Sequence, residues 1–422
     1  MKYFLPIIAC LMLLASCSKS SGGSERSLAR RTVIVYMAAE NNLGTGYEAT
    51  NIQDMAKGSL NLGDDCRLLV FLDKPNSYVK PFIAQVTKDA THPLDTLYRY
   101  EEDFLTSDGD KMSEVIARAA SIAPAREYGL VLWGHANGWI VEKDSVTAQQ
   151  RRAYGVDTGN NTSSTSGKWM NIPTLASALQ QSGLHFKFIF FDCCNMQNIE
   201  VAYELRHSTD YLIGSPAEIT GVGAPYNTVV KDFFLSSDEQ MYKGICNDYY
   251  EQIDYVGGHL PISVIKTDAL EPLAQATHDV LRQVYTNVPQ DEFDKGHIYY
   301  YGLVQNDGWS VNYLPNEKTL YDMNDIIRWG LAADSAAYTA WRAVFDSAVV
   351  YSRMSTYWHA NQIKSKAAYK TFADFDVTAE AFGGVSMFFP QTIYDSSPYY
   401  KHNELIKRMQ WYYAVGWSAV GW

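Results

Sequence analysis

Short apolar runs alternate with stretches of helical periodicity along the first half of the chain. Runs rich in β-branched and aromatic residues, typical of buried strands, occupy residues 31–37, 67–72, 130–133, 186–191 and 211–214. Apolar residues at helical spacing fill the intervals, at 47–55, 112–119, 172–184 and 199–205. This alternation predicts an α/β fold with helices on both faces of a mostly parallel sheet. Residues 82–86 and 96–100 instead alternate apolar with polar positions, which predicts a peripheral hairpin.

The second half of the chain follows a looser pattern. After about residue 235 come Tyr-rich helices, with strand candidates at 262–265 and 384–389. The aromatic tail at 411–422 is expected to pack as core rather than to bind carbohydrate. We therefore expect a main domain over residues 31–235 and a C-terminal lobe of helices and strands over residues 236–422, packed on the main domain and able to extend its sheet.

The N-terminal segment carries an export signal. Residues 1–16 combine an early positive charge with an apolar stretch too short for a stable transmembrane helix. The sequence Leu14-Ala-Ser-Cys17 resembles the bacterial lipobox, after which the new N-terminal cysteine is acylated. We expect Cys17 to be a lipid anchor, residues 17–30 a polar tether, and the protein to be held at the periplasmic or surface face of the cell envelope. The alternative is an ordinary secretory signal cut nearby.

Composition narrows the classes of partner. With 47% hydrophobic and 19% charged residues among 422, the chain can bury a substantial core. Its net charge of −12, without any dense basic run, argues against nucleic acid, because phosphate backbones are bound by clustered Lys and Arg. The oligomeric state stays open.

The cysteines do not form the pattern of a disulfide scaffold. Outside the N-terminal segment the chain has Cys66, Cys193, Cys194 and Cys246, and adjacent cysteines rarely bridge each other. At least one thiol is therefore expected to be free for chemistry. The sequence has no CxxC pair, HExxH helix or EF-hand-like loop, so we predict no metal and no cofactor, while calcium dependence stays open.

A histidine and a cysteine each come shortly after a strand-like run. His135 follows residues 130–133, and Cys194 follows residues 186–191. Because chemistry in a doubly wound sheet collects at the carboxyl ends of parallel strands, the fold can bring imidazole and thiol together. Taken singly, each has an alternative, a satisfied core histidine or an inert buried thiol. Together they indicate nucleophilic catalysis, with the main-chain N–H groups of Gly134 and Cys194 as oxyanion donors.

Three segments carry a family resemblance: residues 33–43, the box Trp133-Gly-His-Ala-Asn-Gly-Trp139, and residues 191–205. Together with residues 155–158, 215–226 and 383–390, they resemble in order and spacing the signatures of the clostripain family of cysteine peptidases. The resemblance implies a caspase-like αβα sandwich, as in caspases and gingipains, with residues 31–235 as the catalytic domain.

The resemblance also assigns the two catalytic positions. His135 matches the family histidine and Cys194 the family cysteine. Cys193 stands where the family usually has Ala, and Asn195 where it usually has Leu. We prefer Cys194 to Cys193 as the nucleophile.

A specificity for basic side chains is a further implication. Members of the family typically cleave peptide or protein substrates after Arg or Lys, which pair with carboxylates of the S1 pocket. Asp192 matches a family acidic position, and Glu218 is the next candidate, with a solvated loop glutamate as its alternative. Related sequences often carry another acid where this chain has Gly221-Val-Gly-Ala-Pro225.

The segment between the two catalytic residues is polar. Residues 141–168 are rich in Ser, Thr, Gly and Asn, which predicts a long exposed loop. Several family members mature by self-cleavage in this loop, and here it carries Lys143, Arg151 and Arg152. The resemblance implies cleavage between Lys143 and Lys168 into two associated chains. The alternative is a flexible loop that is not cut.

The sequence thus predicts a lipid-anchored cysteine endopeptidase that works through a His135–Cys194 dyad and an acyl-enzyme. Two other functions stay open. One is a catalytically silent binding lipoprotein of the same fold, which would have no reason to keep both residues. The other is an acyl-transfer enzyme such as a transpeptidase, which would use the same dyad.

Overall fold

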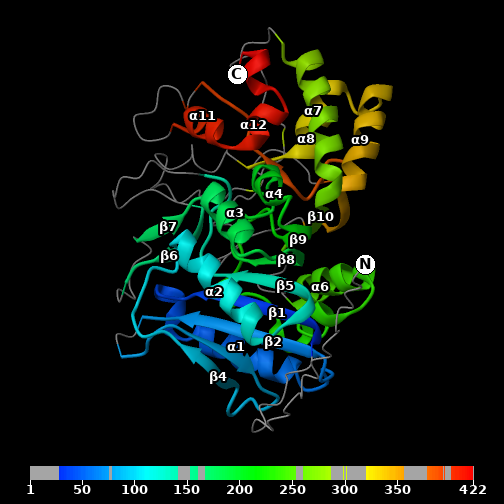
Figure 1. Cartoon of the computed structure of the whole chain (residues 1–422). Helices are drawn as coiled ribbons and strands as arrows, with labels where there is room; N and C mark the ends of the chain where they lie inside the picture. The colour runs from blue at the N-terminus through cyan, green and yellow to red at the C-terminus, as the bar shows by residue number, and fades with distance from the viewer. Residues whose placement is uncertain are drawn as a thin grey trace, which may run out of the picture.

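The computed structural model describes residues 28–75, 78–140, 153–159, 167–252, 260–286, 298, 301, 320–355, 378–392, 394 and 401–421. Their centre is a sheet with the strand order β12-β10-β9-β8-β5-β1-β2-β3-β4 (Figure 1). Its middle is formed by parallel strands: β1 (Ala29–Ala38), β2 (Cys66–Asp73), β5 (Ala125–Trp133), β8 (Phe186–Asp192) and β9 (Thr209–Gly214). Each coincides with a predicted run, so the predicted mostly parallel α/β sheet is confirmed.

Antiparallel strands form both edges of this sheet. The predicted peripheral hairpin is confirmed as β3 (Phe82–Val86) and β4 (Leu94–Arg99), which extend the sheet beyond β2. At the other edge, β10 (Ile262–Lys266) pairs with β9, and β12 (Val349–Arg353) pairs with β10. The part of the chain after residue 235 therefore contributes to the same sheet as the first half.

Helices flank the sheet in two contiguous groups. One consists of α1 (Tyr47–Gly58), α5 (Tyr226–Val229) and α6 (Asp238–Gln252). The other consists of α2 (Gly109–Ile122), α3 (Ile172–Gln181) and α4 (Ile199–Leu205). The apolar spacing that predicts α2 becomes its buried face, and Asp108 caps its start by accepting a hydrogen bond from the Lys111 N–H at 3.0 Å.

Further helices gather beyond the β10 side of the sheet (Figure 1). They are α7 (Leu270–Val284), α8 (Met323–Leu331), α9 (Ala336–Ala348), α11 (His402–Leu405) and α12 (Gln410–Ala414). Trp411 and Trp417 are fully buried, and Trp411 packs edge-on against Tyr203 of α4 with ring centroids 5.4 Å apart. The predicted packing of the aromatic tail as core is confirmed for Trp411, Tyr412 and Trp417, whereas Tyr413 is exposed. Among the described helices, none is long and apolar enough to span a bilayer.

Short 3-10 turns connect several of these elements. They are η1 (Asn42–Thr45), η2 (Asp232–Phe234), η3 (Thr267–Ala269), η5 (Ile406–Arg408) and η6 (Trp417–Val420). Of these, η1 comes shortly after β1, and its Asn42 side chain contacts His135 in the loop after β5.

Two predicted elements differ from the structure. The strand expected at 384–389 is reduced to β13 (Ser386–Met387), which pairs with β11 (Tyr321–Asp322) and not with the central sheet. Next to it, the N–H groups of Gly383 and Gly384 donate to Oδ2 of Asp322 at 2.9 and 3.2 Å, which ties this segment to β11. The loop expected over 141–168 is exposed only in part. Its described residues include β6 (Tyr154–Asp157), paired with β7 (Lys168–Met170), and Tyr154 is fully buried.

Candidate active site

His135 and Cys194 lie at the carboxyl ends of two neighbouring parallel strands. Strands β5 and β8 pair with Trp133 opposite Asp192 at their last residues. His135 follows Trp133 by two positions, and Cys194 follows Asp192 by two. The fold therefore places the two predicted catalytic residues at equivalent positions along one edge of the sheet, where both are half-buried.

The imidazole of His135 is oriented by an amide from the end of β1. Its Nε2 lies 2.6 Å from Oδ1 of Asn42, in the turn η1. Because an amide oxygen only accepts hydrogen bonds, Nε2 carries the ring proton and Nδ1 keeps a lone pair. Burial lowers the pKa of His135 to about 4. At neutral pH the ring is therefore an uncharged base.

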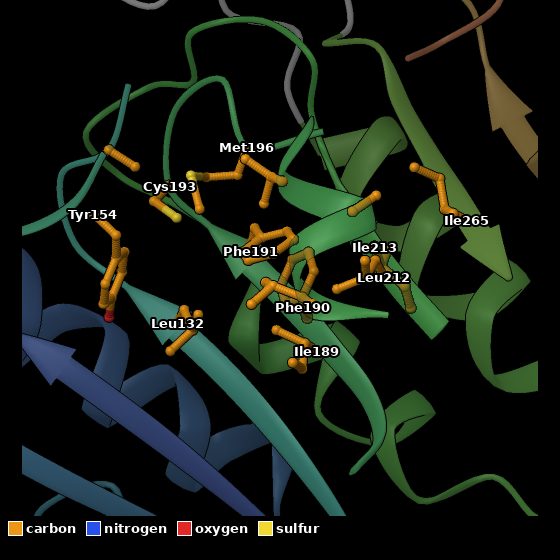
Figure 2. Close-up of a cluster of buried hydrophobic side chains, with 14 of the residues drawn as sticks. Leu132, Tyr154, Ile189, Phe190, Phe191, Cys193, Met196, Leu212, Ile213 and Ile265 are labelled. Carbon is orange, nitrogen blue, oxygen red and sulfur yellow. The ribbon is translucent and has the colours of Figure 1, made fainter. Parts of the chain in front are cut away.

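Cys193 and Cys194 occupy different environments. Cys193 is fully buried in an apolar cluster with Phe191 and Met196 (Figure 2), and burial raises the pKa of its thiol well above the usual range. Cys194 is half-buried, and its Sγ lies 3.4 Å from the N–H and 3.8 Å from the carbonyl oxygen of Ile219. The carbonyl accepts from a thiol, whereas the N–H stabilises a thiolate. Accessibility and this N–H both favour Cys194 as the nucleophile.

Asn195 makes the turn that follows the nucleophile. Its φ of 58° lies in the left-handed region, which Asn adopts more readily than most residues with a side chain. Its Nδ2 donates to Oδ1 of Asn137 at 3.2 Å, and its N–H donates to the Ala217 carbonyl at 2.9 Å. Asn195 thus ties the loop after β8 to the loop after β5. The positive φ and the bond to Asn137 explain why this chain has Asn where the family usually has Leu.

Asp192 is a buried acid at the end of β8. It is 3% exposed, and its Oδ2 accepts a hydrogen bond from the Tyr226 hydroxyl at 2.7 Å. Its Oδ1 is buried and has no hydrogen-bond partner within the described ranges. Burial raises the pKa of Asp192 to about 6. Gly223, with φ 66°, lies against this carboxylate, since a Cβ there would be 2.7 Å from Oδ2.

Glu218 belongs to the segment that contacts the nucleophile. It is half-exposed and lies between Ala217 and Ile219, whose main chains bond Asn195 and Cys194. The structure therefore brings both predicted S1 acids to the same region of the sheet edge. The other predicted residues fall outside the described part of the chain: Cys17, Lys143, Arg151 and Arg152.

The predicted oxyanion donor Gly134 is engaged elsewhere. Its N–H donates to the main-chain carbonyl of Asp192 at 3.4 Å, which continues the β5–β8 ladder. Two positions later, Ala136 forms an antiparallel bridge with Tyr154, and the flanking residues make its two hydrogen bonds, at 2.8 and 2.9 Å. The N–H of the central residue in such a bridge points away from the partner strand. Ala136, next to His135, therefore presents its N–H away from β6.

Comparison with known proteins decides the class of this site. A model of the clostripain family matches residues 35–422. The chain belongs to the clostripain family. The family resemblance predicted from the motifs is confirmed, and with it the cysteine peptidase class.

Solved structures of C11 proteases resemble more than nine-tenths of the chain. A secreted C11 cysteine protease from Bacteroides thetaiotaomicron, in complex with an irreversible peptide inhibitor, is 28% identical with a TM-score of 0.71, over 93% of this chain and 100% of that one. An inactive zymogen C11 protease from Parabacteroides distasonis is 27% identical with a TM-score of 0.68, over 92% and 99%. These likenesses confirm the caspase-like sandwich. Among curated proteins, none matches the chain.

Three contacts of this clostripain-family site are missed by reasoning from the sequence. Asn42 lies within the segment 33–43 that carries the resemblance, but nothing in the pattern assigns it to His135. Ile219 acts through its main chain, so its side chain gives no signal. Tyr226 looks like an ordinary aromatic residue at the start of a helix, although its hydroxyl bonds Asp192.

Proposed function

We propose that this protein is an exported, lipid-anchored endopeptidase that cleaves after Arg or Lys through a His135–Cys194 dyad. The observation that carries the proposal is the pairing of β5 with β8, which puts an uncharged imidazole and an accessible sulfur at equivalent strand ends. Export is supported by the similar protein from Bacteroides thetaiotaomicron, which is described as secreted. The anchor at Cys17 is supported by its lipobox-like sequence.

The dyad supports acyl transfer with every proton accounted for. Sγ of Cys194 passes its proton to Nδ1 of His135 and forms a bond to the carbonyl carbon of the scissile peptide, whose π electrons move to oxygen. Collapse of the tetrahedral intermediate restores the carbonyl, breaks the C–N bond and transfers the proton to the leaving amine. Water then attacks the thioester with His135 as base, and the released thiolate takes the proton back.

The negative oxygen of the tetrahedral intermediate needs main-chain donors. Because the Gly134 N–H bonds the Asp192 carbonyl, we assign this role to Ala136, together with the N–H of Cys194. Ala136 lies in the bridge to Tyr154 of β6, and Cys194 lies in the turn after β8. This assignment replaces Gly134 by a residue two positions further along the chain.

Asp192 supports a preference for a basic side chain before the scissile bond. Its buried Oδ1 has unused hydrogen-bonding capacity, which a guanidinium or ammonium group would fill. Pairing with that cation would also offset the cost of keeping this carboxylate charged in a buried site. Glu218 supplies a second carboxylate on the neighbouring segment.

Maturation by self-cleavage between Lys143 and Lys168 is part of the proposal. The candidate residues Lys143, Arg151 and Arg152 are of the type that the proposed specificity selects. On the C-terminal side of the dibasic pair, the buried strand β6 would keep the second chain attached. The similar protein from Parabacteroides distasonis is described as an inactive zymogen, which agrees with such a step.

The deciding experiment compares the full chain with Cys194→Ala and Cys193→Ala on fluorogenic peptides that carry Arg, Lys, Asp or Leu before the scissile bond. We expect Cys194→Ala to lower kcat/KM by roughly 1,000-fold or more and to stay one band on a denaturing gel. Cys193→Ala should keep activity within about threefold, because its sulfur only fills the core. Product analysis separates hydrolysis, which yields a free acid, from transfer to an added amine.

Two outcomes contradict the proposal. One is normal turnover by Cys194→Ala. The other is loss of activity in Cys193→Ala while its circular dichroism and melting temperature match those of the wild type. An active wild type that remains a single band removes only the self-cleavage step.

A further inference from the structure

Trp169 lies beside the imidazole of the proposed catalytic base. It is the middle residue of β7 and is half-buried. Its ring centroid is 6.4 Å from that of His135, and the two ring planes are tilted by 49°. A tryptophan offers a ligand a large, rigid and mostly apolar surface, and little conformational entropy is lost when that surface is covered. Such a surface next to the base lies where a substrate has to bind.

Main-chain contacts fix the position of Trp169 relative to His135. The N–H of Gly155, in β6, donates to the His135 carbonyl at 2.8 Å. The residue before it, Tyr154, is fully buried and pairs with Met170, which follows Trp169 in β7. The loop after β5 and the strands β6 and β7 are therefore held together by successive backbone pairs. Trp169 keeps its place beside the imidazole because this ribbon is anchored by the buried Tyr154.

Trp169 and the proposed S1 acid Asp192 belong to opposite faces of the sheet. Asp192 accepts from Tyr226, the first residue of α5, which packs with α1 and α6 on one face. Trp169 comes three residues before α3, and Asp157, at the end of β6, accepts at 2.8 Å from the N–H of Thr106, shortly before α2. Helices α2 and α3 pack together on the other face (Figure 1). A peptide with its basic side chain at Asp192 and its scissile bond at the dyad therefore continues, beyond that bond, toward Trp169.

The chemistry of the dyad identifies which substrate residue reaches Trp169. His135 transfers its proton to the leaving amine, so the nitrogen of the residue after the scissile bond comes within hydrogen-bonding distance of the imidazole. That nitrogen is bonded to the Cα of the same residue, so the side chain begins about 2.5 Å from the nitrogen. A ring centred 6.4 Å from the imidazole is within reach of a side chain of the size of Leu or Phe.

We propose that Trp169 forms the subsite for the residue after the scissile bond, and that this subsite prefers a large apolar side chain. The inference rests on the proposed function, because it takes His135 as the group beside the leaving amine. Contact between such a side chain and the indole removes apolar surface of both from water. An indole face also attracts cations. Lys168, exposed and adjacent to Trp169 in β7, would repel a basic side chain there.

Competition between internally quenched peptides tests the subsite in the full chain. The peptides carry Arg before the scissile bond and Leu, Phe, Gly or Lys after it. The ratio of two kcat/KM values in one mixture does not depend on the fraction of active enzyme. We expect the wild type to prefer Leu and Phe over Gly by about tenfold or more, and Trp169→Ala to bring these ratios within about twofold of one. Trp169→Phe should keep part of the preference.

Trp329→Ala is the matched control. Trp329 is 48% exposed on α8, away from the strand ends that carry the dyad, so its loss should leave the wild-type ratios unchanged. If Trp169→Ala does not fold, Trp169→Thr decides, because a β-branched residue suits a strand and also lacks the indole.

Partition of the acyl-enzyme provides a second measurement. An added amine attacks the thioester carbon, the C–S bond breaks, and the proton of the amine passes through His135 to the released sulfur. In the wild type, leucinamide should intercept the acyl-enzyme about tenfold better than glycinamide, and in Trp169→Ala the two should be equal within about twofold.

Equal ratios in the wild type and Trp169→Ala overturn the subsite, and so does a preference of the wild type for Lys over Leu. A loss of kcat/KM that is the same for all four peptides also contradicts it, because the indole would then only support His135. Turnover by Cys194→Ala contradicts the proposed nucleophile but leaves a ratio that depends on Trp169 in force. Failure of the subsite and failure of the proposed function are therefore distinguishable.

Discussion

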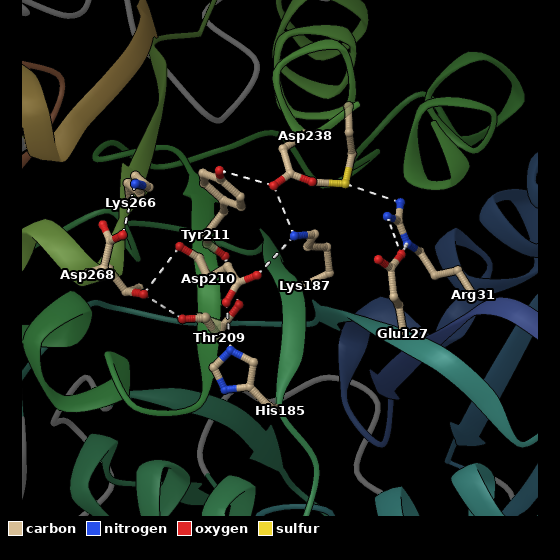
Figure 3. A network of polar contacts seen from close by, with 12 residues as sticks. Arg31, Glu127, His185, Lys187, Thr209, Asp210, Tyr211, Asp238, Lys266 and Asp268 are labelled. Atoms are coloured by element: carbon tan, nitrogen blue, oxygen red, sulfur yellow. Dashed lines mark hydrogen bonds and ion pairs between the residues drawn. The ribbon is translucent and has the colours of Figure 1, made fainter. Parts of the chain in front are cut away.

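The two ends of the parallel strands differ in how their charges are paired. At the amino ends, charged side chains meet opposite charges (Figure 3). Nη2 of Arg31 lies 2.7 Å from Glu127, and Nζ of Lys187 lies 3.1 Å from Asp210 and 2.9 Å from Asp238. Each of these basic side chains is therefore paired with at least one carboxylate at the same edge of the sheet.

At the carboxyl ends, the groups near the proposed active site are not paired in this way. His135 is held uncharged by burial, and Asp192 keeps an oxygen without a hydrogen-bond partner in the described ranges. Carboxylate oxygens of Glu40, Asp73 and Asp103 lie within 4.8 Å of one another. Groups that are left unpaired at a cost in stability are available to bind a substrate, a proton or an ion. The comparison therefore separates an edge that holds the fold together from an edge that carries the chemistry.

The largest effect on this comparison is expected from Asp192→Asn. Removing the buried negative charge should lower kcat/KM for Arg and Lys peptides on the order of 100-fold, since a buried charged contact contributes about 2–5 kcal/mol. Turnover of a Leu peptide should change little. Steady-state kinetics with matched peptides that differ only in the residue before the scissile bond measure kcat/KM for each peptide.

The pH dependence of kcat/KM checks whether the charge of Asp192 causes this effect. Because its pKa in the free protein is about 6, the carboxylate is charged above that pH and neutral below it. In the wild type, kcat/KM for basic peptides should therefore fall as pH drops through about 6, and Asp192→Asn should lack this limb. Parallel losses for Arg and Leu peptides would mean that Asp192 positions the strand end and does not bind the cation.

A smaller effect is expected from Asn42→Ala. The 2.6 Å hydrogen bond between Asn42 and Nε2 holds the imidazole in its reactive orientation. Its loss should raise the activation free energy by about 1.4 kcal/mol, which lowers kcat about tenfold. The shorter side chain also admits water to His135, so the acid limb of kcat should move upward from about pH 4 toward the usual pKa of histidine. Thr50→Ala, an exposed change in the adjacent helix α1 whose hydroxyl donates to the Gly46 carbonyl, is the matched control. An unchanged acid limb would show that Asn42 does not set the environment of the ring.

Regular elements were predictable from the sequence because they depend on local patterns. Strand β1 is a continuous apolar run since it is buried on both faces, and residues 33–39 are fully buried. The positions of His135 and Cys194 just after two strands follow from the same pattern and the family motifs, whereas the order of the strands comes from the structure. The choice between Cys193 and Cys194 rests on different evidence in the structure, since two adjacent sulfurs differ there by burial and by the Ile219 contact.

Features built from distant segments were not predictable. Glu40, Asp73 and Asp103 come from the segment after β1, the end of β2 and the segment before α2, and each alone looks like an ordinary acid at the end of an element. Gly134 was expected to be an oxyanion donor because it lacks a Cβ, but hydrogen-bond direction in the ladder decides which N–H is available. That direction depends on the register of β5 against β8, which no periodicity in either strand specifies.

The smallest effect is expected at the amino ends, from Lys187→Met. Its side chain is 19% exposed and its partners Asp210 and Asp238 are 42% and 35% exposed, so solvent screens both pairs and their loss should cost at most about 1 kcal/mol. The melting temperature should fall by about 2 °C at low salt and by less in about 1 M NaCl, while kcat/KM stays within about twofold. Lys266→Met is the control, because its pair with Asp268 is 41% and 67% exposed and should contribute nothing measurable. A marked loss of activity in Lys187→Met with an unchanged melting temperature would contradict the distinction between the two edges. The ion pairs of Lys187, at the amino end of β8, would then affect the chemistry at its carboxyl end.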